Sequence, residues 1–233
     1  MKLSIVIPAY NERETIEEII RRVQAVSVGA IEKEIIIVDD GSTDGTNEIV
    51  RNIPDIRVVT HKKNIGKGGA VKTGFRHATG DILLIQDADL EYDPKDYGDI
   101  IDPIVKGYAD ITNGVRIQPP RDARRKKSYY WISWLGSKFI TVVTNILYWH
   151  NAGEYEGCYK AFRKSVIDTI SIETNDFDFD NELICKLLRK KIRIVDVSIH
   201  YYPRDYGDGK KIRFYHGVKI LRTIIKWRFK RVV

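Results

Sequence analysis

The stretch DILLIQDAD, residues 81–89, carries the clearest indication of the fold. Its run of apolar residues is typical of a strand that is buried on both faces, as in a parallel sheet covered by helices. Similar runs occur at residues 3–9, 34–39 and 56–60. These short apolar runs predict a central sheet in the first half of the chain.

Between those runs, apolar residues recur at the spacing of an amphipathic helix. Residues 16–26 carry apolar side chains three or four positions apart, and Asn11 is available to cap the start of this helix. Further helices are expected near residues 69–78 and 94–105. The alternation predicts an α/β fold class, with a mostly parallel central sheet, right-handed crossovers and flanking helices.

The composition is that of a folded protein with a sizeable core, because 43% of the 233 residues are hydrophobic. We expect one continuous domain made of two halves, residues 1–115 and 116–233. Cys158 and Cys185 have neither CxxC spacing nor a matching histidine cluster, so we predict no disulfide framework or zinc site, and a reducing cytoplasm fits best. No uncharged apolar run reaches the roughly 18 residues that a membrane-spanning helix needs.

Charge is distributed unevenly between the two halves. Residues 1–115 contain 14 basic and 20 acidic residues, whereas residues 116–233 contain 25 basic and 12 acidic residues. A basic half suits nucleic acid, anionic lipid headgroups or phosphorylated substrates, and a solvated basic surface without a partner is the alternative. Because no RNA- or DNA-binding motif is present, we expect no nucleic-acid partner.

Polar residues follow three of the predicted strands. Residues 8–12 (PAYNE), Asp39-Asp40 and Asp87-Ala88-Asp89 each come directly after an apolar run. In an open parallel sheet, ligands bind beyond the carboxyl ends of the strands. We therefore expect these segments to meet in one cleft.

The spacing of Asp87 and Asp89 lets both carboxylates approach one hard cation, either Mg²⁺ or Mn²⁺. Two aspartates at a strand end also commonly cap the following helix, so the spacing alone is a weak signal. Asp39 and Asp40 are candidates for binding a nucleotide base or ribose, or for capping the turn at residues 41–45. The loop NIGKGG at residues 64–69, with Lys67, is either a backbone that approaches a ligand closely or a plain turn.

Four ordered motifs together resemble the family 2 glycosyltransferases: SIVIPAYNE (4–12), IIIVDDGSTDGT (35–46), NIGKGGAVKTG (64–74) and QDADLEYDP (86–94). Later segments resemble the dolichyl (polyprenyl) phosphate hexosyltransferase branch of that family, which includes dolichol-phosphate mannose synthase-like enzymes. They are GVR (114–116), GCYKAFR (157–163), FDFDNEL (177–183) and HYYPRDYGDGKK (200–211).

This resemblance implies the GT-A (Rossmann-like) fold with C-terminal amphipathic helices, and a metal-dependent, inverting sugar transfer. It places the metal on Asp87 and Asp89 and assigns catalytic roles to Asp89, Glu154, Arg204 and Lys210. The donor-binding residues it implies, with Lys67 added, are Pro8, Ala9, Tyr10, Glu12, Asp39, Asp40, Lys67, Asp87, Ala88 and Asp89.

The basic half would serve the acceptor and the leaving group. The resemblance puts Arg116, Lys127 and Lys138 near an acceptor phosphate, although relatives usually carry Arg where this chain has the two lysines. It lets Arg204, Lys210 and Lys211 clamp the departing diphosphate. A phosphate acceptor is already ionised near neutral pH and needs no general base, whereas a hydroxyl acceptor needs one.

Glu154 stands where relatives usually carry Asp, so its role as a base, as a positioning group or as a salt-bridge partner is left open.

Two stretches have the pattern of membrane-surface helices. In residues 129–149, small and polar residues line one face and leave a broad apolar surface. In residues 214–229, an apolar stripe and a basic stripe are joined by Trp227 and Phe229, which suit an interfacial anchor. Packing of these stripes as ordinary core is the alternative.

The function predicted from the sequence is transfer of a hexose from a UDP- or GDP-sugar to dolichyl or polyprenyl phosphate. We expect the protein to be cytoplasmic and peripheral on the cytoplasmic face of the membrane. A hydroxyl acceptor on a glycan or other lipid is the first alternative, and a non-catalytic nucleic-acid-binding module is the weaker one. The sequence leaves the sugar, the base and the oligomeric state open.

Overall fold

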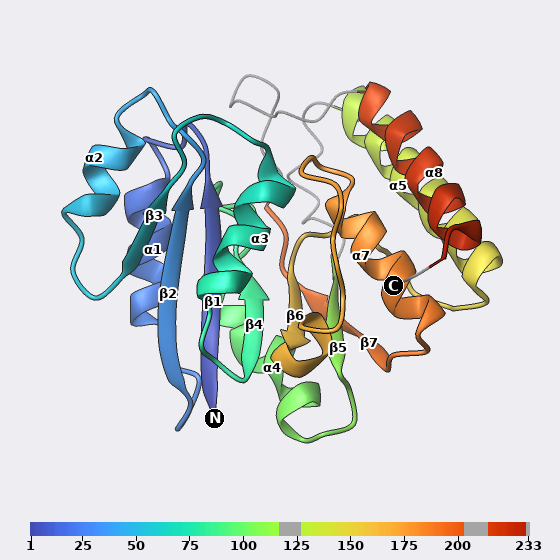
Figure 1. The fold of residues 1–233 in the computed structure, drawn as a ribbon, viewed down its shortest axis with the longest axis horizontal. Helices are drawn as coiled ribbons and strands as arrows, with labels where there is room; N and C mark the ends of the chain where they lie inside the picture. Colours follow the sequence, from blue (N-terminus) through green and yellow to red (C-terminus); the bar gives the residue numbers. More distant parts are fainter. Residues whose placement is uncertain (117–126, 203–213, 232–233) are drawn as a thin grey trace.

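A computed structural model describes residues 1–116, 127–202 and 214–231. Within these residues, seven strands form one sheet in the order β3-β2-β1-β4-β6-β5-β7 (Figure 1). All pairings are parallel except those of β6, which runs antiparallel between β4 and β5. The expected mostly parallel sheet is confirmed. The strands are β1 (Lys2–Ala9), β2 (Glu32–Asp39), β3 (Arg57–Thr60), β4 (Ile82–Ile85), β5 (Ile111–Arg116), β6 (Lys160–Arg163) and β7 (Ile194–Ile199).

The central strands are buried on both faces, which explains their continuous apolar runs. Odd-numbered residues of β1, such as Ile5, pack with α1 and α4, whereas Val6 packs with α3 and α7 on the opposite face. Helices therefore cover the sheet on both sides. The helices near the sheet are α1 (Ile16–Ala25), α2 (Thr46–Arg51), α3 (Lys67–His77), the 3₁₀ turn η1 (Pro94–Asp96), α4 (Tyr97–Val105), α6 (Lys164–Ile167) and α7 (Phe179–Arg189).

The boundary expected at residue 115 falls inside β5, so both halves of the sequence contribute strands to the same sheet. β4 from the first half pairs with β6 from the second half, in the register Leu83 to Phe162. The assignment of separate roles to the two halves stays a prediction.

The expected capping of α1 by Asn11 is wrong. The helix begins at Ile16 after Thr15, and no side chain caps it. Asn11 instead adopts a left-handed conformation with φ of 52°, which asparagine tolerates better than most residues. Its Oδ1 accepts a hydrogen bond of 2.9 Å from the backbone N–H of Thr43. Asn11 thus joins two loops rather than ending a helix.

Two long helices, α5 (Lys127–Tyr148) and α8 (Phe214–Phe229), lie side by side at one edge of the molecule (Figure 1). They pack on each other and on α7. The small polar side chains of α5 face inward, and Ser137, Thr141 and Thr144 are buried. Large apolar side chains of α5, such as Phe139 and Ile146, are more than half exposed, and contact of this face with a membrane stays a prediction. No helix within the described ranges is long and apolar enough to cross a membrane.

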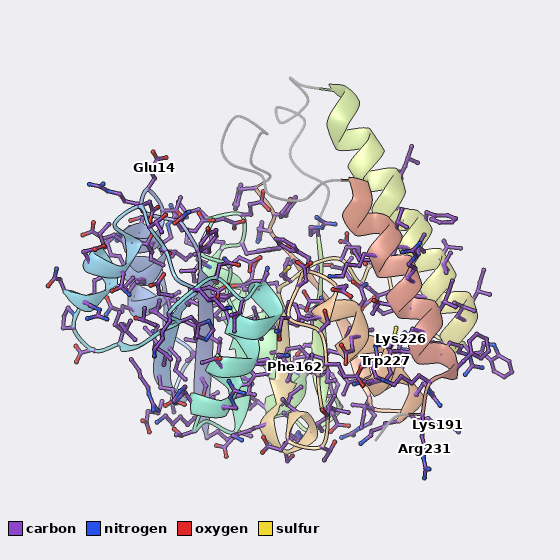
Figure 2. The ribbon with its side chains drawn as sticks, turned by 45° about the horizontal axis from the view of Figure 1, so that its top comes forward. Glu14, Phe162, Lys191, Lys226, Trp227 and Arg231 are labelled. Atoms are coloured by element: carbon purple, nitrogen blue, oxygen red, sulfur yellow. The ribbon has the colours of Figure 1, made fainter. Side chains whose placement is uncertain are left out.

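The prediction that Trp227 anchors the protein at a membrane is wrong. Its side chain is 2% exposed and packs with Ile220 and Ile224 in a cluster between α5, α7 and α8. The ammonium of Lys186 lies 3.7 Å from its ring centroid, and Lys226 lies next to it (Figure 2). Phe229, two residues further along and therefore on another face of the helix, is 78% exposed. Large apolar residues thus lie on more than one face of α8, and the face with Ile220, Ile224 and Trp227 is the buried one.

We predict that Gly74→Ala lowers the free energy of unfolding by about 1–3 kcal/mol. Gly74 lies where α3 crosses β1, and an added Cβ would overlap the side chain of Val6. The matched control is Gly98→Ala in α4, where no atom lies within 4 Å of the added Cβ. Because alanine favours helices, this control should be neutral or slightly stabilising. Urea unfolding of both variants measures the difference, and equal effects would contradict the packing described here.

Candidate functional site

The loops that follow β1 and β2 are fastened to each other at the carboxyl edge of the sheet. The backbone N–H of Glu12 donates to Thr46 Oγ1 at 3.0 Å, and that of Arg13 donates to Asp44 Oδ2 at 3.0 Å. Pro8 and Ala9 end β1, and Tyr10 and Glu12 follow as half-buried residues. The structure therefore brings the first two sequence segments together in one rigid rim.

Asp39 and Asp40 are both buried and both hold the backbone in place. Asp39 accepts hydrogen bonds from the Ser42 N–H at 3.1 Å and from Asn47 Nδ2 at 2.7 Å. Asp40 accepts from the N–H groups of Ile65 and Gly66 and lies 2.6 Å from His61 Nδ1. Capping of the turn at residues 41–45 therefore accounts for the contact of Asp39 with Ser42, whereas Asp40 holds the loop at residues 64–69. Contact of either one with a nucleotide stays a prediction.

The glycines of the NIGKGG loop serve close packing between chain segments. A Cβ on Gly66 would lie 2.5 Å from the carbonyl oxygen of Asn175, and one on Gly68 would lie 2.6 Å from Cβ of Phe179. The Gly69 N–H donates to the Asn175 carbonyl at 3.0 Å. These contacts press the first turn of α3, which carries Lys67, against the segment that leads into α7.

Lys67 contacts the segment that follows β4. Its Nζ lies 2.5 Å from Asp87 Oδ1 and 3.0 Å from Cys158 Sγ. Burial alone would lower the pKa of the Lys67 ammonium, but the charge of Asp87, with Cys158 and Asp180, raises it well above the ordinary value. Lys67 is thus a permanent cation beside Asp87.

Asp89 lies at the same edge, and its Oδ1 accepts from the Glu91 N–H at 3.1 Å. Ala88 between the two aspartates is buried. Among the described residues, no cluster of three or more His, Cys, Asp or Glu side chains is arranged to hold a metal ion. Two half-buried carboxylates one residue apart nevertheless fit an ion such as Mg²⁺, which commonly takes one or two carboxylates and completes its shell with substrate phosphates and water.

Arg116, at the end of β5, forms a tight pair with Glu154. Its Nε donates to Glu154 Oε2 at 2.9 Å, Nη2 contacts Oε1, and Ser137 Oγ donates to the same Oε1 at 2.8 Å. The guanidinium also stacks 4.8 Å from the ring centroid of Tyr201. Burial tends to raise the pKa of Glu154, but the hydrogen bond and charge of Arg116 lower it overall. The geometry favours the salt-bridge interpretation of Glu154 over that of a general base.

The other predicted acceptor and leaving-group residues are only partly described. Lys138 donates to the Gly153 carbonyl at 2.8 Å, next to Glu154. Lys127 is the first residue of α5, and its side chain is not among those that the structure describes. Arg204, Lys210 and Lys211 lie outside the described residues.

A group of polar side chains from residues 156–181 lies near Asp87 and Arg116 in the fold, and no role for it could be inferred from the sequence. Lys160 is fully buried, and its Nζ donates to the carbonyls of Tyr155 and Gly157 and lies 4.0 Å from Asp180 Oδ1. Asn181 Nδ2 donates to Glu156 Oε1 at 2.8 Å. The motifs GCYKAFR and FDFDNEL marked the segments, but only the fold brings them together. We call this group the inner polar cluster: Glu156, Cys158, Lys160, Asp180 and Asn181.

Comparison with known proteins agrees with this arrangement. The family model described as "Glycosyl transferase family 2" matches residues 4–171. Relatives from Salmonella dublin and Salmonella gallinarum, each named undecaprenyl-phosphate 4-deoxy-4-formamido-L-arabinose transferase, are 29% identical over 216 residues. The match covers 90% of this chain and 62% of each relative, so the chain spans less than two thirds of their length.

Solved structures show the same fold. Glucosyl-3-phosphoglycerate synthase from Mycobacterium tuberculosis, in complex with Mn²⁺, UDP and phosphoglyceric acid, superposes with a TM-score of 0.75 at 18% identity, over 99% of this chain and 79% of that one. The same enzyme with Mg²⁺ and UDP gives a TM-score of 0.73 at 18% identity, over 97% of this chain and 79% of that one. The GT-A fold expected from the sequence is confirmed.

We predict that Glu154→Gln destabilises the protein by about 3 kcal/mol at neutral pH, because it leaves Arg116 partly buried without its counter-ion. The pKa of Glu154 is lowered in the folded state, so the stabilisation is complete above the ordinary value of 4.5 and is lost as the pH falls through the folded value. The difference in the free energy of unfolding between wild type and variant, called the gap below, should therefore become smaller in acid.

Urea unfolding across this pH range measures the gap. Glu14→Gln, at an exposed residue that projects from the protein in Figure 2, is the control and should show no gap at any pH. A gap for Glu154→Gln that does not change with pH would contradict the ionised pair.

Proposed function

Because the chain belongs to glycosyl transferase family 2, we propose that it is a metal-dependent, inverting glycosyltransferase that transfers a sugar from a nucleotide diphosphate to a polyprenyl phosphate. The observation that carries this proposal is the placement of charge along one edge of the sheet. Asp87 and Asp89, with Lys67, lie at the end of β4, and Arg116 lies at the end of β5. One end of this row suits a metal and a diphosphate, and the other suits an acceptor phosphate.

On the donor side, Asp87 and Asp89 would hold Mg²⁺ or Mn²⁺. The bound ion would neutralise charge on the departing diphosphate. Lys67 keeps Asp87 oriented through their 2.5 Å contact and adds a positive charge at the N-terminus of α3. The proposed nucleotide-binding edge is formed by the loop after β2 and by the residues at the end of β1, namely Pro8, Ala9, Tyr10 and Glu12.

On the acceptor side, Arg116 positions a phosphate whose oxygen attacks the anomeric carbon from the face opposite the diphosphate. The second ionisation of a phosphate monoester, near pKa 6, already supplies this nucleophile at neutral pH. A hydroxyl acceptor would instead require a general base. Glu154 is bound to Arg116 and Ser137 and has a lowered pKa, so the pairing supports the phosphate acceptor.

The curated relatives support the acceptor class, since their names specify undecaprenyl phosphate. Those names also specify a 4-deoxy-4-formamido-L-arabinose, which is not a hexose. For this chain we keep the hexose as the proposed transferred sugar, with either UDP or GDP as the carrier.

We predict that the protein transfers labelled sugar to a polyprenyl phosphate, giving an organic-extractable product, and that Asp89→Asn reduces the rate on the order of a hundredfold or more. Removal of divalent ions by a chelator should have a similar effect. Asp99→Asn, at an exposed aspartate of α4, is the matched control and should keep full activity. Product on a free glycan alone would refute the acceptor, and full turnover by Asp89→Asn would refute the metal role.

We further propose that the outer face of α5 lies on a membrane surface, on its cytoplasmic side. Apolar residues three or four positions apart along α5 and just beyond its end are each more than half exposed. α8 adds further exposed apolar residues, among them Phe229. Interfacial helices bind membranes through such a continuous apolar face. These residues are Leu135, Phe139, Val142 and Ile146 in α5, and Trp149 directly after it.

We predict that the double variant Phe139→Asp with Ile146→Asp weakens binding to phospholipid vesicles at least about tenfold, because two large apolar groups no longer enter the interface. Cosedimentation with vesicles of neutral and of mixed anionic lipids measures this. The control is Val105→Asp with Tyr108→Asp, which replaces two exposed apolar residues at the end of α4. Equal loss in both double variants, or loss in neither, would exclude the α5 face as the binding surface.

A further inference from the structure

The inner polar cluster has features that its packing alone does not require. Asp180 and Lys160 are buried, and Asp180 Oδ1 has no hydrogen-bond partner among the described residues. Its nearest cation, Lys160 Nζ, is 4.0 Å away. Burying polar groups without full pairing costs stability, so their retention is typical of a functional site.

Glu156 is the member of the cluster that combines charge with access to solvent. Its side chain is half-buried, and its Oε1 accepts a hydrogen bond of 2.8 Å from Asn181, which is itself buried. Burial raises the pKa of Glu156, and Asn181, Lys160 and Arg116 oppose that rise. One carboxylate oxygen is thus held by Asn181, in the neighbourhood of Arg116.

The cluster bridges the donor and acceptor sides of the site. Lys67 contacts Asp87 at 2.5 Å and Cys158 Sγ at 3.0 Å. At the other side, Arg116 Nε donates to Glu154 Oε2 at 2.9 Å. Glu156 lies in the chain between Glu154 and Cys158, so the segment 154–158 joins the proposed acceptor side to the proposed diphosphate side.

An inverting displacement places the transferred sugar between the diphosphate and the attacking phosphate oxygen. Side chains on the segment that joins these two sides would therefore lie closer to the sugar than to the nucleotide. The geometry points to Glu156, held by Asn181, as the residue that accepts a hydrogen bond from a hydroxyl of the transferred sugar and thereby selects the donor. This inference rests on the proposed function. A group that reads a substrate hydroxyl discriminates strongly against sugars that lack it.

The test compares nucleoside diphosphates with their sugar conjugates. Calorimetric titration with Mn²⁺ present gives the Kd of UDP, GDP, UDP-glucose, UDP-N-acetylglucosamine and GDP-mannose for the wild type, Glu156→Gln and Glu156→Ala. We expect Glu156→Ala to weaken binding of the preferred sugar nucleotide about tenfold, with a smaller loss for Glu156→Gln, which keeps an acceptor oxygen. The Kd of the matching free diphosphate should change less than about twofold in both variants.

Two controls separate recognition from folding. Glu14→Gln should bind every ligand as the wild type does, because Glu14 is exposed and projects away from the protein (Figure 2). The thermal midpoint of Glu156→Gln should stay close to that of the wild type, because glutamine keeps a side-chain oxygen that can accept the hydrogen bond from Asn181.

If Glu156→Ala weakened binding of the diphosphate and of the sugar nucleotide equally, or weakened neither, the inference would be overturned while the proposed function stands. A wild type that binds none of the nucleotides would overturn the proposed function, and this inference with it.

Discussion

A carboxylate at the end of a strand that is covered on both faces must find a partner, because an unpaired buried charge is costly. This constraint organises the carboxyl edge of the sheet. Asp40 takes its partners from the start of α3, Asp87 takes Lys67, and Glu154 takes Arg116. Each pair joins segments that are distant in sequence. Between the halves, Arg193 pairs with Asp110 at 2.9 Å, so part of the acidic charge of the first half is balanced by basic charge of the second.

Ion pairs and hydrogen bonds also join α8 to the segment before α7. Lys219 of α8 pairs with Asp176 at 2.7 Å, and Thr223 donates to Asp178 at 2.7 Å. Lys226 pairs with Glu173 at 3.2 Å. Part of the basic stripe of α8 thus holds the segment before α7. The apolar outer face of α5 is left as the surface proposed to meet lipid.

Local features of the fold could be predicted from the sequence, and features set by distant contacts could not. The four apolar runs of the first half became β1 to β4 within a few residues of their expected bounds, because each run reflects burial of its own strand. The antiparallel insertion of β6 beside β4 depends on segments about 80 residues apart. The burial of Trp227 and the exposure of Phe229 could not be told apart from the sequence, because both are large aromatic residues. In the site, the strand-end aspartates were found by their position, whereas Glu156 gains its environment only from Asn181 and Arg116.

The pairing of β4 with β6 has a consequence for how the chain can be divided. A fragment that ended after β5 would leave β4, whose four residues are all apolar and buried, with one edge unpaired. Such an edge is a template for association with other chains. The matched family segment, residues 4–171, includes β6 and so retains this protection. The charge boundary near residue 115 is therefore not a point at which the protein can be cut into soluble modules.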